Sequence, residues 1–418
     1  MKKNIAVIIL AAGRGERMRS AKPKVLHPVC GRPMLAYVLD LTRALKIKNQ
    51  VIVLGHKHEQ VRKIIPSGIK ISIQKKLLGT ADAVKTALRQ LRNFKGTILI
   101  LYGDIPLLKK EAIGKLLKYH VDNNLDATLL TAQLDKPSGY GRILRDRYAS
   151  ISGIAEEKDA DDFQKDIKEI NTGIICFNKE RLIAALNKVR PNNRKKEYYL
   201  TDTIGILYKN NYLVDGVRIA DINEALGINS RQDLAKANRI MQQRINEELM
   251  KKGVGIVDPD SAFISFGTQI GEDTTIYPFT VIESNVKIGK SCSIGPFAHL
   301  REGTRLGNEV VAGNFLEIVR SSISSKTFAK HFCYLGDSRI GKSVNIGAGT
   351  VTANFDANKK SSTVIKDGAC IGSDTILVAP VKVGRRAITG AGSVLAKKDV
   401  GDGEIVVGVP ARPLTKKR

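Results

Sequence analysis

The apolar positions of this 418-residue chain follow two patterns, which change near its middle. From about residue 4 to about residue 225, short apolar runs alternate with amphipathic stretches. These segments are residues 5–10, 34–45, 50–55, 58–65, 70–74, 81–91 and 97–104. The alternation is typical of βαβ units, so it predicts a Rossmann-like three-layer α/β domain with a mainly parallel sheet over residues 1–228. A ligand is expected at the carboxyl ends of the strands.

A polar stretch without Pro or Gly separates the two patterns. Within residues 229–252 it carries apolar side chains at Leu234, Ile240, Ile245 and Leu249, and Gly253 follows. A long segment of good helix formers closed by a glycine predicts a connecting helix over residues 229–252.

In the second half, aliphatic side chains recur every six residues. The unbroken series is Ile264, Ile270, Ile276, Ile282, Ile288, Ile294, Leu300 and Leu306, and the register returns at Ile340, Ile346, Ile365, Ile371, Leu377 and Val383. A period of six fits one side of a triangular coil, with each aliphatic side chain pointing inward. The pattern resembles the hexapeptide-repeat family, which implies a left-handed parallel β-helix over residues 253–408 and leaves a basic tail at 409–418.

Residues 308–330 fall outside this period. We expect them to leave the coil as a long loop, because loops on repeat scaffolds often build functional sites.

The net charge of +27 is the one unusual bulk property, and it favours anionic partners. Aromatic residues make up only 5% of the chain, tryptophan is absent and the lysines are spread along the whole sequence, so we expect no nucleic-acid partner. The longest early apolar run, residues 5–12, is too short to span a bilayer, so we expect a soluble protein with no membrane insertion.

The five cysteines are widely scattered and form no CxxC pair. Neither a zinc site nor a disulfide framework is indicated, and a reducing cytoplasm fits best.

A glycine-rich segment directly follows the first predicted strand. Gly13 and Gly15 let backbone N–H groups approach phosphate oxygens, while Arg14, Arg17 and Lys24 supply positive charge. Arg17 and Lys24 would stabilise a triphosphate in the transition state, or they form an ordinary solvated surface. Asp104 ends the apolar segment ILILYGD, where it would bind Mg2+ or cap the strand.

The segment LAAGRGERM, followed by Pro23-Lys24, is similar to the signature of sugar-1-phosphate nucleotidyltransferases. It lacks the third glycine of a dinucleotide fingerprint. The later words QKKLLGTADAV, LYGDIPLL, GYGRI, AEEKDA, INTGI, EYYLTD and GIN come in the order of the bifunctional N-acetylglucosamine-1-phosphate uridyltransferase and glucosamine-1-phosphate acetyltransferase family. The resemblance covers essentially the whole chain.

This resemblance implies a front site that transfers uridylyl from UTP. The implied nucleotide-binding residues are Leu10, Ala11, Ala12, Gly13, Lys24, Gln74, Gly79 and Thr80, and Gln74 offers an amide to the uracil edge. The implied sugar-phosphate residues are Tyr102, Gly141, Glu156, Asn171, Asn229 and either Tyr199 or Thr201. Asn229 is implied as the second ligand of Mg2+ beside Asp104.

The resemblance implies an acetyltransferase site in the second half. His331 is a lone histidine of the kind that is usually structural, but the words YLGD and NIGAGT around it match the family's site, which implies a general base that removes a proton from the acceptor amine. The implied acetyl-acceptor residues are Arg301, Tyr334, Asn345 and Lys360. The implied acetyl-CoA residues are Ala348, Asn354, Ser373 and Ala391. A homotrimer with sites between neighbouring subunits is implied as well.

Three departures from the family pattern concern the second reaction. Val319 replaces the first lysine of an EIKK-like run and Arg320 the second, so one phosphate contact is lost unless Arg320 substitutes. The usual NYDG word reads NFDA at residues 354–357, and the tail VVGVPARPL is of the generic hexapeptide type.

Two alternatives to the bifunctional enzyme therefore stay open. The first is a nucleotidyltransferase whose β-helix has another acceptor or only assembles subunits. The second is a non-catalytic regulatory scaffold, which Arg17, Lys24 and Asp104 disfavour.

Overall fold

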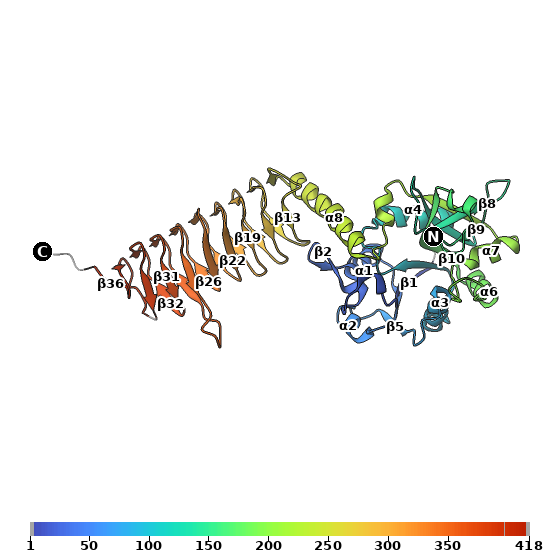
Figure 1. Cartoon of the computed structure of the whole chain (residues 1–418), viewed down its shortest axis with the longest axis horizontal. Coiled ribbons are helices and arrows are strands. Elements are labelled where there is room, and N and C mark those ends of the chain that lie inside the picture. The colour runs from blue at the N-terminus through green and yellow to red at the C-terminus, as the bar shows by residue number, and fades with distance from the viewer. Residues whose placement is uncertain (1–3, 397, 415–418) are drawn as a thin grey trace. The chain divides into compact units, whose positions relative to one another are not determined.

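The computed structural model describes residues 4–396 and 398–414, so the last four residues of the predicted basic tail lie outside the described part. The chain divides into two compact units, Met1–Asn238 and Arg239–Arg418, which we call the front and rear units (Figure 1).

The front unit is built on a mixed nine-stranded sheet with the main order β11-β7-β10-β6-β1-β4-β5. These strands are β1 (Ile5–Ala11), β4 (Asn49–Leu54), β5 (Lys70–Ile73), β6 (Thr97–Tyr102), β7 (Ala127–Gln133), β10 (Glu169–Asn178) and β11 (Val214–Arg218). Strands β6, β1, β4 and β5 pair in parallel, as predicted, whereas β10 runs antiparallel between β6 and β7. A branch of β8 (Gly141–Arg145) and β9 (Ile151–Ala155) pairs with β10.

Helices cover both faces of this sheet and give the predicted three layers. Strand β1 sends Ala6, Ile8 and Leu10 into one core and the alternate residues Val7 and Ile9 into the other. One core includes residues of α3 (Thr80–Leu88), α6 (Lys179–Lys188) and α7 (Asp202–Lys209). The other core includes residues of α1 (Met34–Ala44), α2 (His58–Arg62) and α4 (Lys110–Asp122).

Short elements complete the front unit. They are η1 (Glu16–Met18), η2 (Lys24–Leu26), β2 (Pro28–Val29), β3 (Arg32–Pro33), η3 (Arg89–Leu91), α5 (Asp162–Lys165) and η4 (Ile222–Ala225).

The rear unit is a parallel β-helix of three sheets, seen as stacked coils in Figure 1. The first sheet holds β12 (Gly255–Ile256), β15 (Thr275–Ile276), β18 (Ser293–Ile294), β21 (Val311–Ala312), β24 (Phe328–Ala329), β27 (Asn345–Ile346), β30 (Cys370–Ile371), β33 (Ile388–Thr389), β35 (Ile405–Val407) and the antiparallel β36 (Arg412–Pro413). The second holds β13 (Phe263–Ile264), β16 (Val281–Ile282), β19 (His299–Leu300), β22 (Leu316–Val319), β25 (Cys333–Gly336), β28 (Val351–Ala353), β31 (Ile376–Val378) and β34 (Val394–Ala396). The third holds β14 (Gln269–Ile270), β17 (Lys287–Ile288), β20 (Arg305–Leu306), β23 (Ser322–Ile323), β26 (Ser338–Ile340), β29 (Thr363–Ile365) and β32 (Val381–Val383).

The six-residue aliphatic series forms the core of these coils, as predicted. Ile264, Ile282 and Leu300 stack in register on the second sheet and are fully buried. Each aliphatic side chain is therefore covered by the next coil.

The prediction that residues 308–330 leave the coil is wrong. They form β21, β22, β23 and β24, and Leu306, Ile323 and Ile340 pair in one register. One coil, from Ile288 to its register partner Leu306, spans eighteen positions. The next two coils, which end at Ile323 and Ile340, are each one residue shorter, and this change hides the six-residue period. The segment that interrupts the coil instead is residues 354–362, between β28 and β29.

Helix α8 (Arg231–Lys251) joins the two patterns of the chain. Gly253 adopts φ +87° just after it, in the left-handed conformation that favours glycine at a helix end. Among the described residues, no helix has the length and apolarity needed to cross a membrane. All five cysteines are free thiols.

Candidate active sites

The carboxyl ends of β1 and β6 bring three polar side chains together. Lys24 Nζ forms an ion pair with the Asp104 carboxylate and donates a hydrogen bond to Asn229 Oδ1 at 2.7 Å. The Gly103 amide bonds to the Leu10 carbonyl at 2.9 Å, which holds Asp104 at the end of the first strand. The side chains of Lys24 and Asp104 are only 13% and 18% exposed. Two side-chain oxygen atoms thus converge on one ammonium nitrogen.

The glycine-rich segment lies beside this group. Leu10, Ala11 and Ala12 are buried, and a Cβ added at Gly13 would meet no atom within 4 Å. A Cβ at Gly15, where φ is +67°, would lie 2.6 Å from Lys24 Cβ. The backbone at Gly13 is therefore open to a ligand, while Gly15 lets Lys24 approach closely. Arg17 lies on η1 and is exposed.

Gln74, Gly79 and Thr80 form a second group, at the end of β5 and the start of α3. The Gln74 amide nitrogen donates to Asp82 Oδ2 at 2.7 Å and to the Gly79 carbonyl at 3.1 Å. The Leu200 amide donates to Thr80 Oγ1 at 2.9 Å. These bonds hold the Gln74 amide plane and tie the start of α3 to the segment before α7. Sequence reasoning missed Asp82, although it stands inside the matched word QKKLLGTADAV.

The predicted sugar-phosphate residues gather around the branch of β8 and β9. Gly141 and Asn171 are register partners, and a Cβ at Gly141 would lie 3.6 Å from Glu156 Oε2. Thr201 Oγ1 donates to Glu156 Oε1 at 2.8 Å, so Thr201 touches the carboxylate directly. Tyr199 is buried at 9% exposure.

Burial and like charges shift several acids of this group. Burial raises the pKa of Glu156, which the hydrogen bond from Thr201 opposes. Burial and the nearby carboxylates Glu156 and Asp159 raise the pKa of Asp202 to about 6. Burial also raises the pKa of Tyr102, and the negative charges of Glu156 and Asp104 raise it further.

Arg142 is a residue of this region that sequence reasoning did not single out. Its side chain is 2% exposed and forms an ion pair with Glu157 Oε2 at 2.8 Å. Its guanidinium also donates to the carbonyls of Tyr140 and, at 3.3 Å, Lys165. It therefore anchors the segment that carries Glu156 to the strand that carries Gly141.

In the rear unit, His331 and three predicted acetyl-CoA residues form one column. His331 follows the inward-facing Ala329 by two residues, and Ala329, Ile346, Ile371 and Thr389 are partners in register. The residues two positions after these partners are Ala348, Ser373 and Ala391. The column runs along the corner between the first and second sheets, and His331 is exposed there.

Other predicted residues lie on the second sheet and at its far corner. Asn354 Nδ2 donates to the Asp337 carboxylate, and a Cβ at Gly336 would lie 2.7 Å from the Tyr334 hydroxyl and 2.8 Å from Asn354 Nδ2. Arg320 binds both oxygens of Asp337, at 2.6 and 2.8 Å, and this pairing lowers the pKa of Asp337. Sequence reasoning missed Asp337, although the quoted word YLGD contains it.

The other three predicted acceptor residues lie at different places relative to Tyr334. Arg301 Nη1 binds Glu317 Oε1 at 2.8 Å, and Glu317 is the register partner of Tyr334 one coil away. Lys360 is exposed on the segment that interrupts the coil. Asn345 lies on the first sheet between Phe328 and Cys370, on a different side of the coil from Tyr334.

Comparison with known families agrees with both halves of this architecture. A family model described as a MobA-like NTP transferase domain matches residues 7–169, and a bacterial transferase hexapeptide model of six repeats matches residues 267–302. The fold and the two groups of polar residues thus define a nucleotidyltransferase joined to a hexapeptide-repeat transferase.

Curated relatives match nearly the whole chain. The bifunctional protein GlmU of Thermosipho africanus is 44% identical over 96% of this chain and 94% of its own length. The GlmU proteins of Shouchella clausii and Thermosipho melanesiensis are 40% and 43% identical, over 93% of this chain and 93% and 91% of their lengths. The chain belongs to the GlmU family.

The chain is thus a bifunctional enzyme that makes UDP-N-acetylglucosamine for cell-wall synthesis. It transfers an acetyl group from acetyl-CoA to glucosamine-1-phosphate. It then transfers uridylyl from UTP to N-acetylglucosamine-1-phosphate and releases pyrophosphate.

Proposed function

We propose that uridylyl transfer takes place at the group formed by Lys24, Asp104 and Asn229. A phosphate oxygen of the sugar attacks the α-phosphorus of UTP and pyrophosphate leaves, a step that needs positioning and charge neutralisation. Lys24 and the exposed Arg17 stabilise the triphosphate charge, and the open backbone at Gly13, which follows the buried Leu10, Ala11 and Ala12, approaches its oxygens. Gln74, Gly79 and Thr80 hold the nucleotide, with the Gln74 amide oriented by Asp82.

Asp104 and Asn229 are the proposed protein ligands of Mg2+. Both are hard oxygen donors, and both bind the same ammonium nitrogen, so a cation fits between them. When bound, Mg2+ neutralises phosphate charge and orients the oxygens of the triphosphate.

The sugar phosphate is proposed to lie between Tyr102, Gly141, Glu156, Asn171 and Asn229. Glu156 and Asn171 supply a carboxylate and an amide for the sugar hydroxyls and the N-acetyl group. The bond from Thr201 orients Glu156, which supports Thr201 as the residue that the sequence left open between Tyr199 and Thr201.

Acetyl transfer is proposed to take place at His331. The imidazole accepts the proton that the acceptor amine loses as it attacks the thioester carbonyl. The C–S bond breaks, CoA leaves as a thiolate, and the imidazolium returns the proton to it. The column of Ala348, Ser373 and Ala391 carries small side chains on the same corner, which leaves room for CoA along the coils. Asn354, which lies at the other end of the second sheet beside Asp337, is the fourth proposed acetyl-CoA residue, and Arg301, Tyr334, Asn345 and Lys360 are proposed to bind the acceptor.

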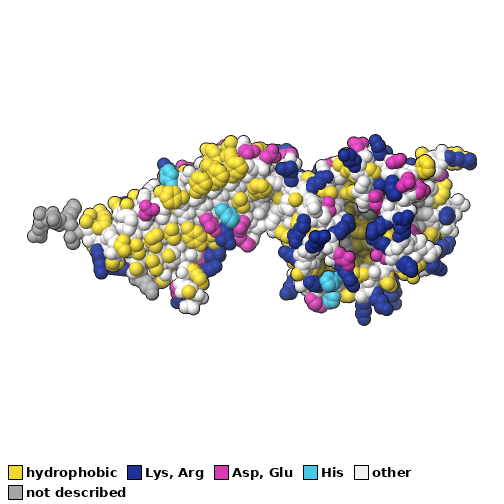
Figure 2. Space-filling view, viewed as in Figure 1, with side chains coloured by type: hydrophobic (Ala, Val, Ile, Leu, Met, Phe, Trp, Pro, Cys, Tyr) yellow, Lys and Arg dark blue, Asp and Glu magenta, His cyan; other side chains and the backbone are white. Residues whose placement is uncertain are grey.

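A homotrimer would complete this second site. Asn345 lies on the first sheet and Tyr334 on the second, so one coil does not present both to one acceptor molecule. A neighbouring copy that contributes its first sheet would do so. Hydrophobic side chains gather along the coils of the rear unit in Figure 2, which supports such a contact. The free cysteines and the substrates UTP and acetyl-CoA support a cytoplasmic location.

Acceptor binding is proposed to be weaker than the EIKK-like pattern would give. Val319 is buried at 2% exposure and carries no charge, and Arg320 is held by both oxygens of Asp337. Neither position therefore offers a free cation to the acceptor phosphate.

The assignment of the uridylyl-transfer site rests on the convergence of Asp104 and Asn229 on Lys24. Two variants, one in each site, test both assignments when each variant is assayed in both reactions. Asp104→Asn is expected to lower UTP-dependent pyrophosphate release by about 100-fold or more and to leave acetyl transfer intact. His331→Ala should abolish CoA release from acetyl-CoA with glucosamine-1-phosphate and leave pyrophosphate release intact. If either variant lost both reactions or neither, the assignment would be wrong.

A further inference from the structure

The three sides of the β-helix differ in the side chains that they present to solvent. Along a strand, the residue next to a buried aliphatic faces outward. On the first sheet these outward positions are Gly255, Thr275, Ser293, Val311, Phe328, Asn345, Cys370, Ile388 and Ile405. On the second they are Phe263, Val281, His299, Glu317, Tyr334, Val351, Ile376 and Val394. Both of these sides are therefore mostly uncharged.

The third sheet is different. Its outward positions are Gln269, Lys287, Arg305, Ser322, Arg339, Val364 and Lys382. Four of these seven residues are cations and none is an acid. We call these four, Lys287, Arg305, Arg339 and Lys382, the cationic column; with strands about 4.8 Å apart it spans about 24 Å.

The cationic column is exposed and uncompensated. All four side chains are exposed, and within residues 4–396 and 398–414 we find no ion pair for any of them. Lys290 and Lys326, at the adjacent corner, pair with Glu272 and Glu309 instead. Lys287 and Arg305 lie on neighbouring strands, where like charges repel. Such a cost is expected where an anionic partner offsets it.

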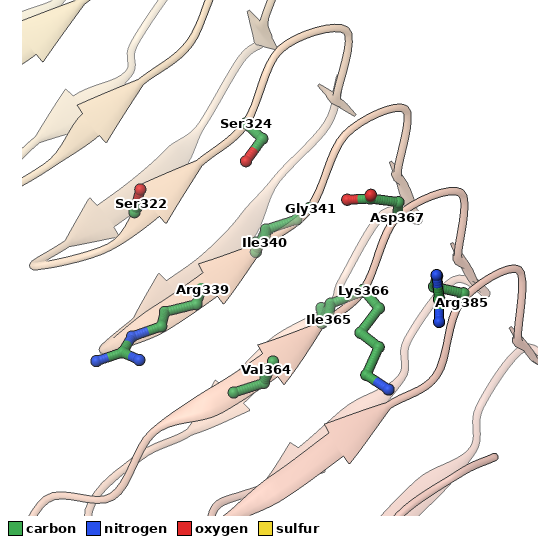
Figure 3. A pocket seen from close by; sticks show the side chains of 10 residues that line it. All are labelled: Ser322, Ser324, Arg339, Ile340, Gly341, Val364, Ile365, Lys366, Asp367 and Arg385. Atoms are coloured by element: carbon green, nitrogen blue, oxygen red, sulfur yellow. The ribbon is translucent and has the colours of Figure 1, made fainter. Parts of the chain in front are cut away.

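The third sheet carries few bulky side chains beside the column. The second outward row of this sheet is mainly glycine, where a Cβ at Gly271 or Gly289 would lie within 2.7 Å of the next coil. A shallow groove of about 450 Å³ opens beside Arg339 and Val364 (Figure 3). At its far edge, Lys366 and Arg385 share Asp402 at 3.4 and 3.3 Å. Asp367 also lines the groove and accepts a bond from the Lys342 amide at 2.8 Å, so Arg339 is the lining cation without an ion pair among the described residues.

We propose that the third sheet docks on the surface of an anionic phospholipid bilayer. The column is planar and extended, and it carries long side chains whose charged ends reach beyond a bare glycine row. It offers no aromatic platform on which the bases of single-stranded nucleic acid could stack. A second copy of this face is excluded as the partner because like charges would meet.

The strength of this contact follows from the number of cations. Each Lys or Arg near an anionic bilayer strengthens binding about fivefold, so four of them give a gain on the order of several hundred-fold. The attachment is peripheral, since Val364 is the one aliphatic residue of the outward row. It should weaken steeply with salt.

The test is co-sedimentation of the full chain with vesicles of equal parts phosphatidylglycerol and phosphatidylcholine, against vesicles of phosphatidylcholine alone. The face variant replaces the cationic column by glutamine: Lys287→Gln, Arg305→Gln, Arg339→Gln and Lys382→Gln. A control variant removes the same charge from exposed positions of the front unit: Arg62→Gln, Lys63→Gln, Arg89→Gln and Lys115→Gln. Both variants should retain both enzymatic reactions, which shows that they fold.

The wild type and the control variant are expected to sediment with phosphatidylglycerol vesicles, and the face variant to stay in solution. The proposal is overturned if the wild type ignores these vesicles, or if both variants lose binding equally, because the net charge of the chain would then be responsible. It is also overturned if a duplex DNA or an acidic protein competes the wild type off the vesicles and itself requires the cationic column for tight binding.

Discussion

Arg142 and Arg145 lie three residues apart on β8 and have different surroundings. Arg142 is almost fully buried, with Glu157 and two backbone carbonyls as partners. Arg145 pairs with Glu169 through two bonds of 2.8 and 2.9 Å at the end of β8, where a third of its side chain is exposed. Breaking a buried pair leaves an uncompensated charge, whereas exposed pairs contribute little.

Arg142→Met should therefore destabilise the front unit by about 3 kcal/mol, and Arg145→Met by about 1 kcal/mol or less. Because Glu157 is next to Glu156, the first variant should also raise the KM for N-acetylglucosamine-1-phosphate more than the KM for UTP. Thermal unfolding and steady-state kinetics of uridylyl transfer measure both effects. Equal losses of stability from the two variants would contradict the role given to Arg142.

The carboxylate group around Asp202 predicts a pH dependence of stability. Its pKa is raised to about 6 in the folded state by burial and by Glu156 and Asp159, so the folded state holds the proton more tightly than the unfolded state. The favourable contribution is fully present below about pH 4 and is lost as the pH rises through about 6. Asp202→Asn does not titrate and escapes this loss.

Relative to the wild type, Asp202→Asn should therefore gain on the order of 1 kcal/mol between pH 4 and pH 7, after allowance for solvent screening. UTP shifts the unfolding transition of the front unit at pH 7, which identifies that transition. Its stability is then measured for both proteins at pH 4 and at pH 7. A difference between variant and wild type that does not change with pH would show that Asp202 is ionised throughout.

At the scale of the element, the turn after β1 is a place where a substitution should affect nucleotide binding but not the stability of the fold. Gly13 has open space around its Cα and φ outside the left-handed region, so an alanine fits there without strain. Gly13→Ala should change the free energy of unfolding by less than about 0.5 kcal/mol. It should nevertheless raise the KM for UTP about tenfold, because the added methyl group occupies the backbone approach to phosphate.

Gly114→Ala is the matched control for this change. Gly114 lies within α4, also with no neighbour within 4 Å, so alanine should stabilise the helix by up to about 1 kcal/mol and leave the KM for UTP unchanged. Unchanged UTP kinetics in Gly13→Ala would remove this turn from the nucleotide site.

The β-helix shows why one part of an element was predictable from the sequence and another was not. Large aliphatic residues at intervals of six, as from Ile264 to Leu306, predict coils directly. The next inward residues are Ala312, Ile318, Ile323, Ala329, Leu335 and Ile340, so two intervals shrink to five and two positions carry only a methyl group. The true interruption left a signal in the interval of thirteen positions from the inward-facing Thr352 to the inward-facing Ile365.

The sites show the same division. Residues inside matched words, such as Lys24 and Asp104, were named from the sequence, and the structure brings them together. Asp337 and Arg142 act through side chains that are distant in sequence, since Arg320 and Asn354 are each 17 residues from Asp337. Such contacts depend on coil length and sheet register, which the local pattern of residues does not contain.

At the scale of the whole molecule, separate cores support separate reactions. The front unit holds two apolar cores on the faces of its sheet, and the rear unit has its own column of aliphatic side chains. A change in the surface of one unit should therefore leave the reaction of the other unit intact. Loss of oligomer assembly through the rear unit should therefore affect acetyl transfer and leave uridylyl transfer intact.

An aromatic ladder on the corner of the His331 column provides the site for this last prediction. Phe279, Phe297 and Phe315 stack with ring centroids 5.0 and 4.8 Å apart, and Phe315 is 61% exposed. If neighbouring subunits meet along this corner, Phe315→Asp places a charge in the contact at a position with φ +53°, which aspartate tolerates. The protein should then shift from trimer to monomer in size-exclusion chromatography with light scattering. Acetyl transfer should fall more than about tenfold, because Asn345 of a neighbour is no longer supplied, while uridylyl transfer persists.

Ser322→Asp adds the same charge on the third sheet and should leave the mass and both reactions unchanged. A Phe315→Asp protein that remained trimeric, or a monomer with full acetyl transfer, would place the subunit contact or the acceptor site elsewhere.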